Sequence, residues 1–154
     1  MKKTIKHYTE SIYHEMELTA KVMRMMAVQF FEKLNNGLIP DEYVALDVIA
    51  CNENICQRDL AKLILKDRAN TGRIVESLEK KGYINRSVDT KNNRLVRKLN
   101  LTEIGHKMVD EITRKVQIQL EETNNLISTK EIEKLKDGIR AFRASLEKLT
   151  ELKI

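Results

Sequence analysis

The chain has 154 residues, of which 42% are hydrophobic and 33% are charged, with five glycines and a single proline. This length allows one domain with its own core, or one domain plus a dimerisation arm, and the composition is typical of a soluble, helix-rich protein. No apolar run approaches the ~20 residues that span a bilayer, and no secretory signal opens the chain. We therefore expect a cytoplasmic protein that does not bind membranes.

Positive charge is concentrated in one part of the sequence. The whole chain carries 28 basic and 23 acidic residues, a net charge of +5. Residues 66–98 carry ten basic and four acidic groups, a net +6, whereas residues 102–154 are balanced at ten of each. A local positive field of this kind favours contact with a polyanion, although a chance cluster on a solvated surface is the alternative.

Apolar periodicity predicts four helices in the first half of the chain. The first covers residues 6–34 and is ended by Asn35-Asn36-Gly37. The second begins at Pro40, a residue that suits the first turn of a helix. A short helix over 57–64 follows, and then a helix with Asp67 as N-cap and Gly82 as its stop.

After Gly82 the apolar period changes from 3.6 to 2, which predicts a β-hairpin of strands 83–88 and 95–101 joined by a loop over 89–93. Thr102 opens a fifth helix. A sixth begins at a Ser128–Glu131 capping box. Its apolar residues alternate in steps of three and four, as in a coiled-coil seam, which favours a helical dimer interface over packing inside one chain. These are Ile132, Leu135, Ile139, Phe142, Leu146 and Leu149.

The predicted helix 67–82 has an unusual outward face. Thr71, Ile74, Val75 and Leu78 form its inward stripe, and the opposite face holds Arg68, Ala69, Asn70, Gly72, Arg73 and Glu76. An ordinary solvated face, which is the alternative here, would mix Glu and Lys at i, i+4. Arginine can bond guanine O6 and N7, and asparagine can bond adenine N6 and N7. A glycine, which costs a helix about 1 kcal/mol relative to alanine, allows close approach of the backbone to DNA. This face is typical of a helix that reads a DNA groove.

The order helix, turn, helix, hairpin is that of a winged helix-turn-helix. The run LAKLILKDRANTGRIVESLEKKGYINR from Leu60 resembles the DNA-binding core of the MarR family of bacterial transcriptional regulators. The following DTKNNRLVRKLNLTEIG from Asp89 resembles that family's wing and its entry into the next helix. The resemblance implies a mainly helical fold with a small β-hairpin wing. It further implies a dimerisation arm from 1–37 and 102–154 around a DNA-binding domain over 38–101.

The resemblance also implies roles for individual residues. The recognition helix would present Arg68, Ala69, Asn70, Gly72 and Arg73 to the major groove, and Arg94 on the wing would enter the minor groove, whose negative potential favours arginine. The family usually has an acid two places before that arginine, and this sequence has Asn92. Lys91, Arg97 and Lys98 are candidate phosphate contacts, or else solvated charges.

For control, the resemblance implies a homodimeric repressor of pseudo-palindromic double-stranded DNA, released by a small molecule bound between arm and DNA-binding lobe. Met23, Met26, Phe30 and Tyr43 are candidate pocket residues, although Met and aromatic residues at helical spacing are more often core. We expect no cofactor.

Cys51 and Cys56 lie five residues apart, and Cys56 falls in the N-cap position of the helix 57–64. A thiol at a helix N-terminus can be activated toward oxidation, so a redox-sensing regulator is an alternative to buried or incidental cysteines. The scattered His7, His14 and His106 and the lack of a C-x-x-C pair argue against a metal site. No G-x-S-x-G, Walker or H-E-x-x-H motif occurs, so we expect no catalytic residues and no enzyme. Further alternatives are an architectural DNA-binding protein and a helical interaction module without DNA binding.

Overall fold

A computed structural model describes residues 5–91 and 94–149, with the backbone alone described at 90–91, 94–95 and 123–124. The chain divides into two compact units, residues 1–43 and 44–154. As the sequence predicts, the described elements are mainly helices, accompanied by one small antiparallel sheet. Among the described residues, no helix is long and apolar enough to span a bilayer.

The first unit contains a short 3-10 turn, η1 (Tyr8–Glu10), and the long helix α1 (Ile12–Leu34). The expectation that the first helix begins near Lys6 is wrong. Ser11 has an extended backbone and its side chain accepts the N–H of His14, so it acts as the N-cap and starts α1 at Ile12. The predicted end is correct, because Asn35 adopts a left-handed conformation and closes the helix.

Helix α2 (Pro40–Cys51) begins at the predicted proline and runs from the first unit into the second. Its first turn is fixed by Glu42, whose carboxylate accepts the N–H of Ile39. This bond explains why Glu42 is buried at only 4% exposure.

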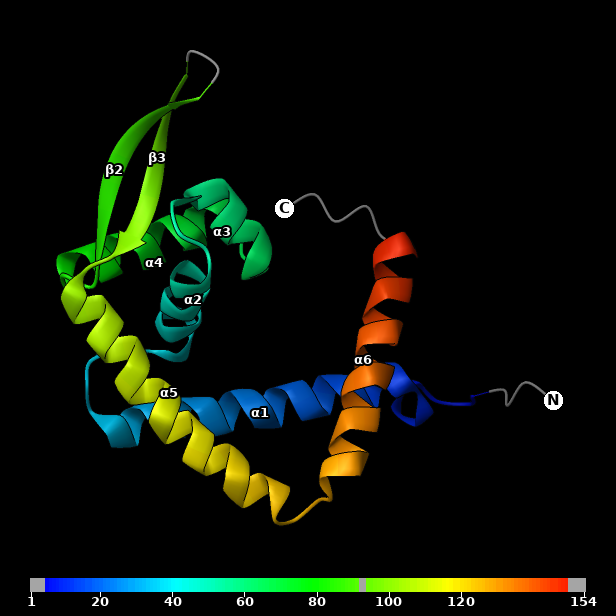
Figure 1. Cartoon of the computed structure of the whole chain (residues 1–154). Coiled ribbons are helices and arrows are strands. Elements are labelled where there is room, and N and C mark those ends of the chain that lie inside the picture. Colours follow the sequence, from blue (N-terminus) through cyan, green and yellow to red (C-terminus); the bar gives the residue numbers. More distant parts are fainter. Residues whose placement is uncertain (1–4, 92–93, 150–154) are drawn as a thin grey trace. The chain divides into compact units, whose positions relative to one another are not determined.

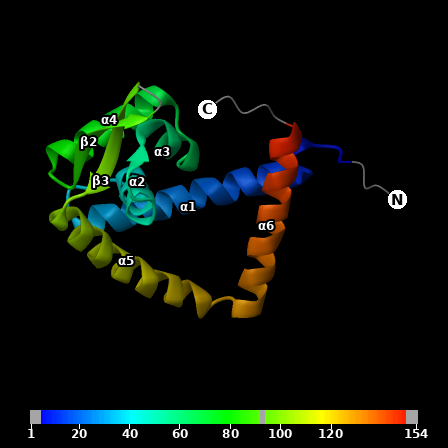
Figure 2. The ribbon, with the colours of Figure 1, turned by 45° about the horizontal axis from the view of Figure 1, so that its top comes forward.

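The second unit contains the helix-turn-helix pair α3 (Gln57–Leu63) and α4 (Arg68–Lys80), which pack against each other (Figure 2). Leu65, in the connection, has a positive φ of 52°, and the neighbouring Lys66 N–H donates to the Ala61 carbonyl. This turn redirects the chain so that the buried side chains of both helices enter one core. That core includes Leu46, Ile49, Leu60, Val75, Leu78, Leu99 and Ile112.

A three-stranded antiparallel sheet in the order β1-β3-β2 completes the winged helix. The hairpin of β2 (Ile84–Lys91) and β3 (Arg94–Leu101) extends away from α3 and α4 in Figure 1. Its strands are longer than predicted, because Asp89 and Thr90 still pair with Val96 and Leu95. The turn-favouring residue types in 89–93 predict a longer loop than the strand pairing leaves. The two-residue strand β1 (Ile55–Cys56) was not predicted, and it is too short to show a period.

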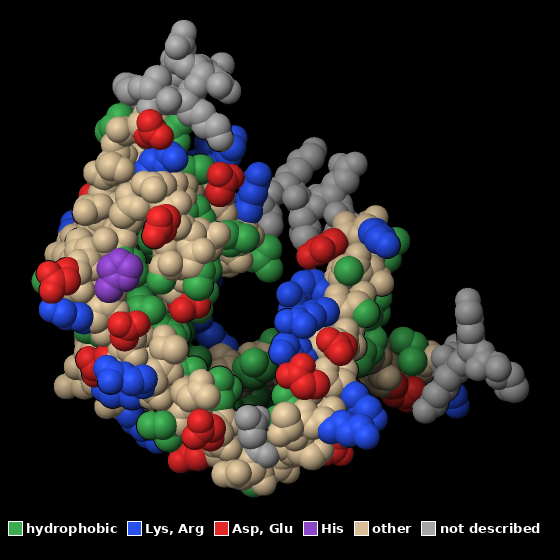
Figure 3. Space-filling model, viewed as in Figure 1, with side chains coloured by type: hydrophobic (Ala, Val, Ile, Leu, Met, Phe, Trp, Pro, Cys, Tyr) green, Lys and Arg blue, Asp and Glu red, His purple; other side chains and the backbone are tan. Residues whose placement is uncertain are grey.

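Helices α5 (Glu103–Asn124) and α6 (Thr129–Leu149) follow the sheet. The predicted capping box starts α6, since the Ser128 N–H donates to Glu131 and the Glu131 N–H donates to Ser128 Oγ. Acidic and basic side chains are interspersed over the surface seen in Figure 3. On α5 they form ion pairs one turn apart, Lys107–Glu103 and Lys115–Glu111. Helix α6 contains no buried residue, although six apolar residues line its seam.

Candidate nucleic-acid interface

Helix α4 has the two faces that the sequence predicts. Thr71, Val75 and Leu78 are fully buried and Ile74 is nearly so, which anchors the helix on the core. Arg68, Ala69, Asn70 and Arg73 are exposed on the other side. The buried stripe therefore holds the helix while two arginines and one amide remain available to a partner outside the unit.

A chain of polar contacts runs along the first turns of α4. One carboxylate oxygen of Asp67 accepts the backbone N–H of Asn70 at 2.8 Å and caps the helix. The other oxygen accepts the side-chain amide of Asn70 at 2.5 Å. The Asn70 oxygen in turn accepts from Arg73 Nη1 at 3.4 Å. The two bonds that Asp67 accepts from Asn70, the backbone one first, hold the pKa of Asp67 below its usual range.

Gly72 lies at the edge of the exposed face, beside α3. A Cβ at this position would be 3.4 Å from Nε2 of Gln57, an ordinary contact with the end of a flexible side chain. Packing within the protein therefore does not require glycine here. The explanation drawn from the sequence, that the helix backbone approaches DNA at this residue, stays a prediction.

The wing places Lys91 and Arg94 opposite each other at the end of the β2–β3 ladder. Their side chains, and the whole of Asn92, lie outside the described part of the chain, so the minor-groove role of Arg94 stays a prediction. Of the two further candidates, Arg97 is exposed, whereas Lys98 is partly buried and lies 3.5 Å from the carboxylate of Asp89 on β2. Lys98 therefore braces the hairpin as well as contributing positive charge.

Arg86 on β2 connects the wing to the recognition helix, a role that the sequence analysis missed. Its Nε lies 3.0 Å from a carboxylate oxygen of Glu79 at the end of α4. This ion pair joins the end of α4 to the first strand of the wing, and the Arg86 side chain is only 25% exposed. A charged residue in an alternating strand carries no signal that distinguishes such a contact from a solvated side chain.

Cys56 occupies the predicted N-cap position of α3, but its sulfur makes no capping hydrogen bond. The thiol instead donates to Asp59 at 3.0 Å, and this bond is the main reason why the pKa of Asp59 is lowered. Cys51 is exposed at the end of α2, and both cysteines are free thiols. The Cys56 contact uses the protonated thiol as the donor, whereas a redox sensor reacts as thiolate.

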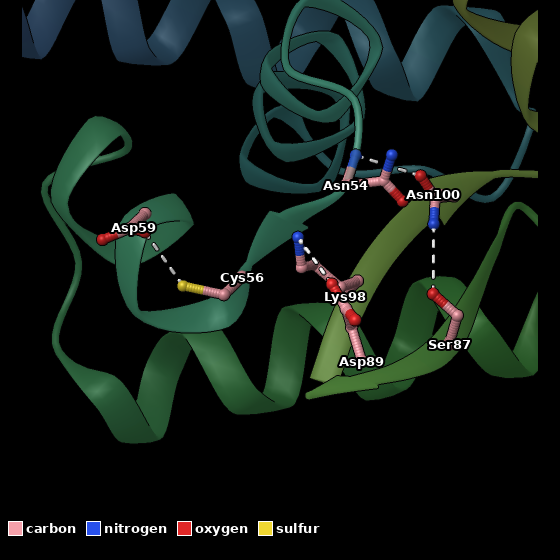
Figure 4. A network of polar contacts seen from close by, with 7 residues as sticks. All are labelled: Asn54, Cys56, Asp59, Ser87, Asp89, Lys98 and Asn100. Carbon is pink, nitrogen blue, oxygen red and sulfur yellow. Dashed lines mark hydrogen bonds and ion pairs between the residues drawn. The ribbon is translucent and has the colours of Figure 1, made fainter. Parts of the chain in front are cut away.

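Figure 4 shows the surroundings of Cys56, where β1, α3 and the wing meet. Asn100 on β3 links β2 to the residue before β1, because its oxygen accepts the N–H of Asn54 at 3.1 Å and its nitrogen donates to Ser87 at 3.5 Å. A hollow of about 540 Å³ opens beside this network. Its lining includes Cys56, Arg58, Asp59, Arg97 and Lys98, a set that the sequence analysis did not bring together.

The four residues expected to line an effector pocket are described within the first unit. Met23 and Met26 are exposed at 64% and 45%. Phe30 contacts Phe31 edge-on and Tyr43 contacts it at a tilt, with ring centroids 5.4 and 5.6 Å apart. A hollow of about 390 Å³ in this unit is lined by other residues of α1 and by the segment up to Pro40, including Arg24, Phe31 and Leu38. None of the four expected residues lines it, so their pocket role stays a prediction. In the described ranges, no group of three or more His, Cys, Asp or Glu side chains could hold a metal ion.

Comparison with known proteins identifies the domain that carries this helix and wing. Residues 38–96 match the model of the MarR family. The transcriptional repressor MprA of Escherichia coli (strain K12) is 28% identical over 146 residues, covering 90% of this chain and 82% of MprA. An uncharacterised HTH-type regulator of Bacillus subtilis (strain 168), YybA, is 26% identical over 137 residues, 89% of each chain.

The fold of this chain is also similar to the folds of solved transcriptional regulators. The crystal structure of the transcriptional regulator SlyA superposes with a TM-score of 0.76 at 26% identity, over 90% of this chain and 95% of SlyA. The Staphylococcus aureus MepR–DNA complex superposes with a TM-score of 0.75 at 20% identity, over 91% and 99% of the two chains, and shows the fold alone. Residues 38–96 therefore form a domain that matches the MarR family model, in a chain whose fold is similar to that of the transcriptional regulator SlyA.

Proposed function

We propose that this protein is a homodimeric DNA-binding repressor whose α4 helices read a pseudo-palindromic operator. The observation that carries the proposal is the exposed Arg68, Asn70 and Arg73 on a helix whose other face is fully buried. Arginine and asparagine are the side chains best suited to guanine and adenine edges in the major groove. The similarity to MprA, which is described as a transcriptional repressor, supports the same assignment.

The dimer is supported by the C-terminal helix. Helix α6 has no buried residue, yet its seam carries apolar side chains such as Leu135 at 60% and Leu149 at 81% exposure. Apolar residues repeated every three and four positions need a partner helix to be removed from water. A two-fold dimer would place two α4 helices on half-sites about 10 bp apart on one side of the duplex. In this arrangement residues 1–37 and 102–154 form the arm around the DNA-binding domain 38–101.

Positive charge beside α4 supports the phosphate part of the contact. Residues 66–98 hold the net +6, and Arg97 on the wing is exposed. Such a surface neutralises phosphates and releases counterions, so affinity falls steeply with salt whatever the sequence. Lys91 and Arg94, on either side of the wing turn, would extend this contact to the flanking minor groove.

Control by a small-molecule effector is the further part of the proposal. A ligand held at the arm would change the separation of the two α4 helices, and a change in that separation would move one helix out of its groove. Met23, Met26, Phe30 and Tyr43 remain the candidate contacts. A ligand can release the operator only to the extent that it binds the released form more tightly than the DNA-bound form.

Selection of genomic fragments by the purified protein tests the proposal. A specific regulator enriches fragments that share a short inverted repeat, and competing DNA of unrelated sequence displaces it poorly. An architectural protein, the alternative from a different class, binds all fragments alike with a steep dependence on salt. A helical interaction module would enrich none.

A thiol switch is the second alternative, and peroxide distinguishes it. If Cys56 or Cys51 senses oxidants, peroxide lowers affinity for the enriched fragment, and Cys56→Ser or Cys51→Ser abolishes that loss. We expect no loss through Cys56, because its thiol proton is held by the carboxylate of Asp59. A serine hydroxyl can keep this hydrogen bond, so Cys56→Ser preserves the local structure.

A further inference from the structure

The Asp67 side chain does more than a helix N-cap requires. Capping uses one acceptor oxygen, and here that oxygen receives the Asn70 backbone N–H at 2.8 Å. The second oxygen receives the Asn70 side-chain amide at 2.5 Å. A serine or threonine would also cap the helix, but its single oxygen offers no second acceptor atom for the side-chain amide of Asn70.

This second bond fixes the direction in which the Asn70 amide points. Its nitrogen lies toward Asp67, at the start of the helix, and its oxygen lies toward Arg73, one turn further on. A side-chain amide has two N–H donors and two acceptor lone pairs. The two contacts use one of each. One donor and one acceptor remain, which is what the N7 and N6 groups of adenine require.

We propose that Asp67 is a positioning residue for sequence recognition, which orients the Asn70 amide, and through it Arg73, before DNA is bound. The inference rests on the proposed function, since it assigns a role within the reading of DNA by α4. An amide already held in the reading orientation loses little side-chain freedom when it meets a base edge. Released, the same amide can rotate and present its donor and acceptor in the reverse order.

The charge of Asp67 allows an experiment to distinguish a positioning role from a purely structural one. A carboxylate at the start of the recognition helix repels phosphates, so it lowers affinity for any DNA. Replacing it with serine is therefore expected to raise affinity for unrelated sequence while lowering discrimination in favour of the operator. A loss of helix stability alone would lower the affinity for unrelated sequence and the affinity for the operator together.

The experiment is a double-mutant cycle of Asp67→Ser and Asn70→Ala. Binding of the wild type, both single variants and the double variant is measured on the duplex that the wild type selects and on a scrambled duplex of equal length. We expect Asp67→Ser to lower the ratio of the two affinities about tenfold, which is within the discrimination of one bidentate contact. Asn70→Ala lowers it as well, and adding Asp67→Ser to Asn70→Ala has no further effect on the ratio.

Glu76→Gln is the matched control. It removes one negative charge from the exposed side of the same helix, about two and a half turns from the Asp67 cap. Glu76 lies 3.5 Å from Lys80, and none of the bonds described for Asn70 involves it. This variant is expected to bind both duplexes more tightly and to leave their ratio unchanged. Thermal unfolding of each variant checks that serine keeps the cap, and Asp67→Thr repeats the test with a second capping residue.

Two outcomes overturn the inference. In one, Asp67→Ser discriminates as well as the wild type. In the other, the losses in ratio from the two single variants multiply in the double variant, so that positions 67 and 70 act independently. If the wild type itself prefers no duplex, the proposed function fails and this inference fails with it. A selective wild type beside an equally selective Asp67→Ser overturns the inference alone.

Discussion

The backbone carbonyl of Tyr83 packs directly against the α-carbon of Gly105, so that a Cβ at position 105 would overlap the Tyr83 oxygen. Two hydrogen bonds fix this approach. The Thr102 hydroxyl donates to the Gly82 carbonyl at 2.6 Å, and the Thr102 N–H donates to the Tyr83 carbonyl at 3.0 Å. The start of α5 is thereby fastened to the chain that leaves α4. This backbone packing explains the glycine three residues after Thr102.

Gly105→Ala is expected to destabilise the protein, because neither of the two backbones can move without breaking the Thr102 bonds. Overpacking of this kind costs about 2 kcal/mol or more. The measurement is the midpoint of chemical unfolding. Gly72→Ala is the matched control, since it also adds one methyl group within a helix but meets only the end of Gln57. Equal midpoints for Gly105→Ala and the wild type would contradict the packing.

Gly72→Ala is also a prediction about DNA. Alanine is favoured over glycine inside a helix by about 1 kcal/mol, so the variant is expected to unfold at higher denaturant concentration. If the α4 backbone approaches DNA at this residue, the added methyl group weakens operator binding at the same time. Affinity measured on the selected duplex tests this. A more stable variant with unchanged affinity would show that the helix backbone stays away from DNA here.

Leu135→Lys tests the proposed dimer. In a single chain this side chain is 60% exposed, so lysine would be tolerated. In a dimer that buries the α6 seam, the charge is desolvated, and the dissociation constant rises on the order of tenfold or more. Sedimentation equilibrium measures it. Leu126→Lys, at an 85% exposed position between α5 and α6, is the control. A dimer equally strong in both variants would place the interface elsewhere.

Stability is expected to fall in acid through the two carboxylates that start α4 and α6. Hydrogen bonds from Asn70 and from Ser128 lower the pKa of Asp67 and of Glu131 below their ordinary values of 3.8 and 4.5. A carboxyl whose folded pKa is lowered stabilises the fold above its ordinary pKa, and this contribution is lost as the pH falls through the folded value. Unfolding midpoints should therefore decrease between about pH 5 and pH 2. Glu131→Gln should reduce the decrease, and an identical pH profile for this variant would argue against the effect.

The sequence predicted the helices of the DNA-binding unit well because their signals are local. Pro40, the Asp67 N-cap and the inward stripe from Thr71 to Leu78 each act within a few residues. The start of the first helix was missed, since its apolar pattern continues through the extended Ser11. Strand β1 was missed because only its partner on β3, far along the chain, makes it a strand.

The candidate site was predicted in its residue types but not in its contacts. Arg68, Asn70 and Arg73 could be placed on one exposed face by helical spacing alone. The link from Asp67 through Asn70 to Arg73 depends on side-chain rotamers, and the Glu79–Arg86 pair depends on how the hairpin meets α4. The spacing of apolar residues along the sequence predicts neither of these contacts. For the same reason, the hollow beside Cys56 joins residues of α3 and β3 that no spacing relates.

The measurement that tests the account most directly is footprinting of the selected genomic fragment by the wild type and by Arg73→Ala at near-physiological salt. Lys107→Ala, which removes one positive charge from an exposed position on α5, is the control. The account predicts protection of a short inverted repeat with half-sites about 10 bp apart, lost or strongly weakened in Arg73→Ala and retained in Lys107→Ala. Protection without sequence preference, or the same footprint from Arg73→Ala as from the wild type, would contradict it.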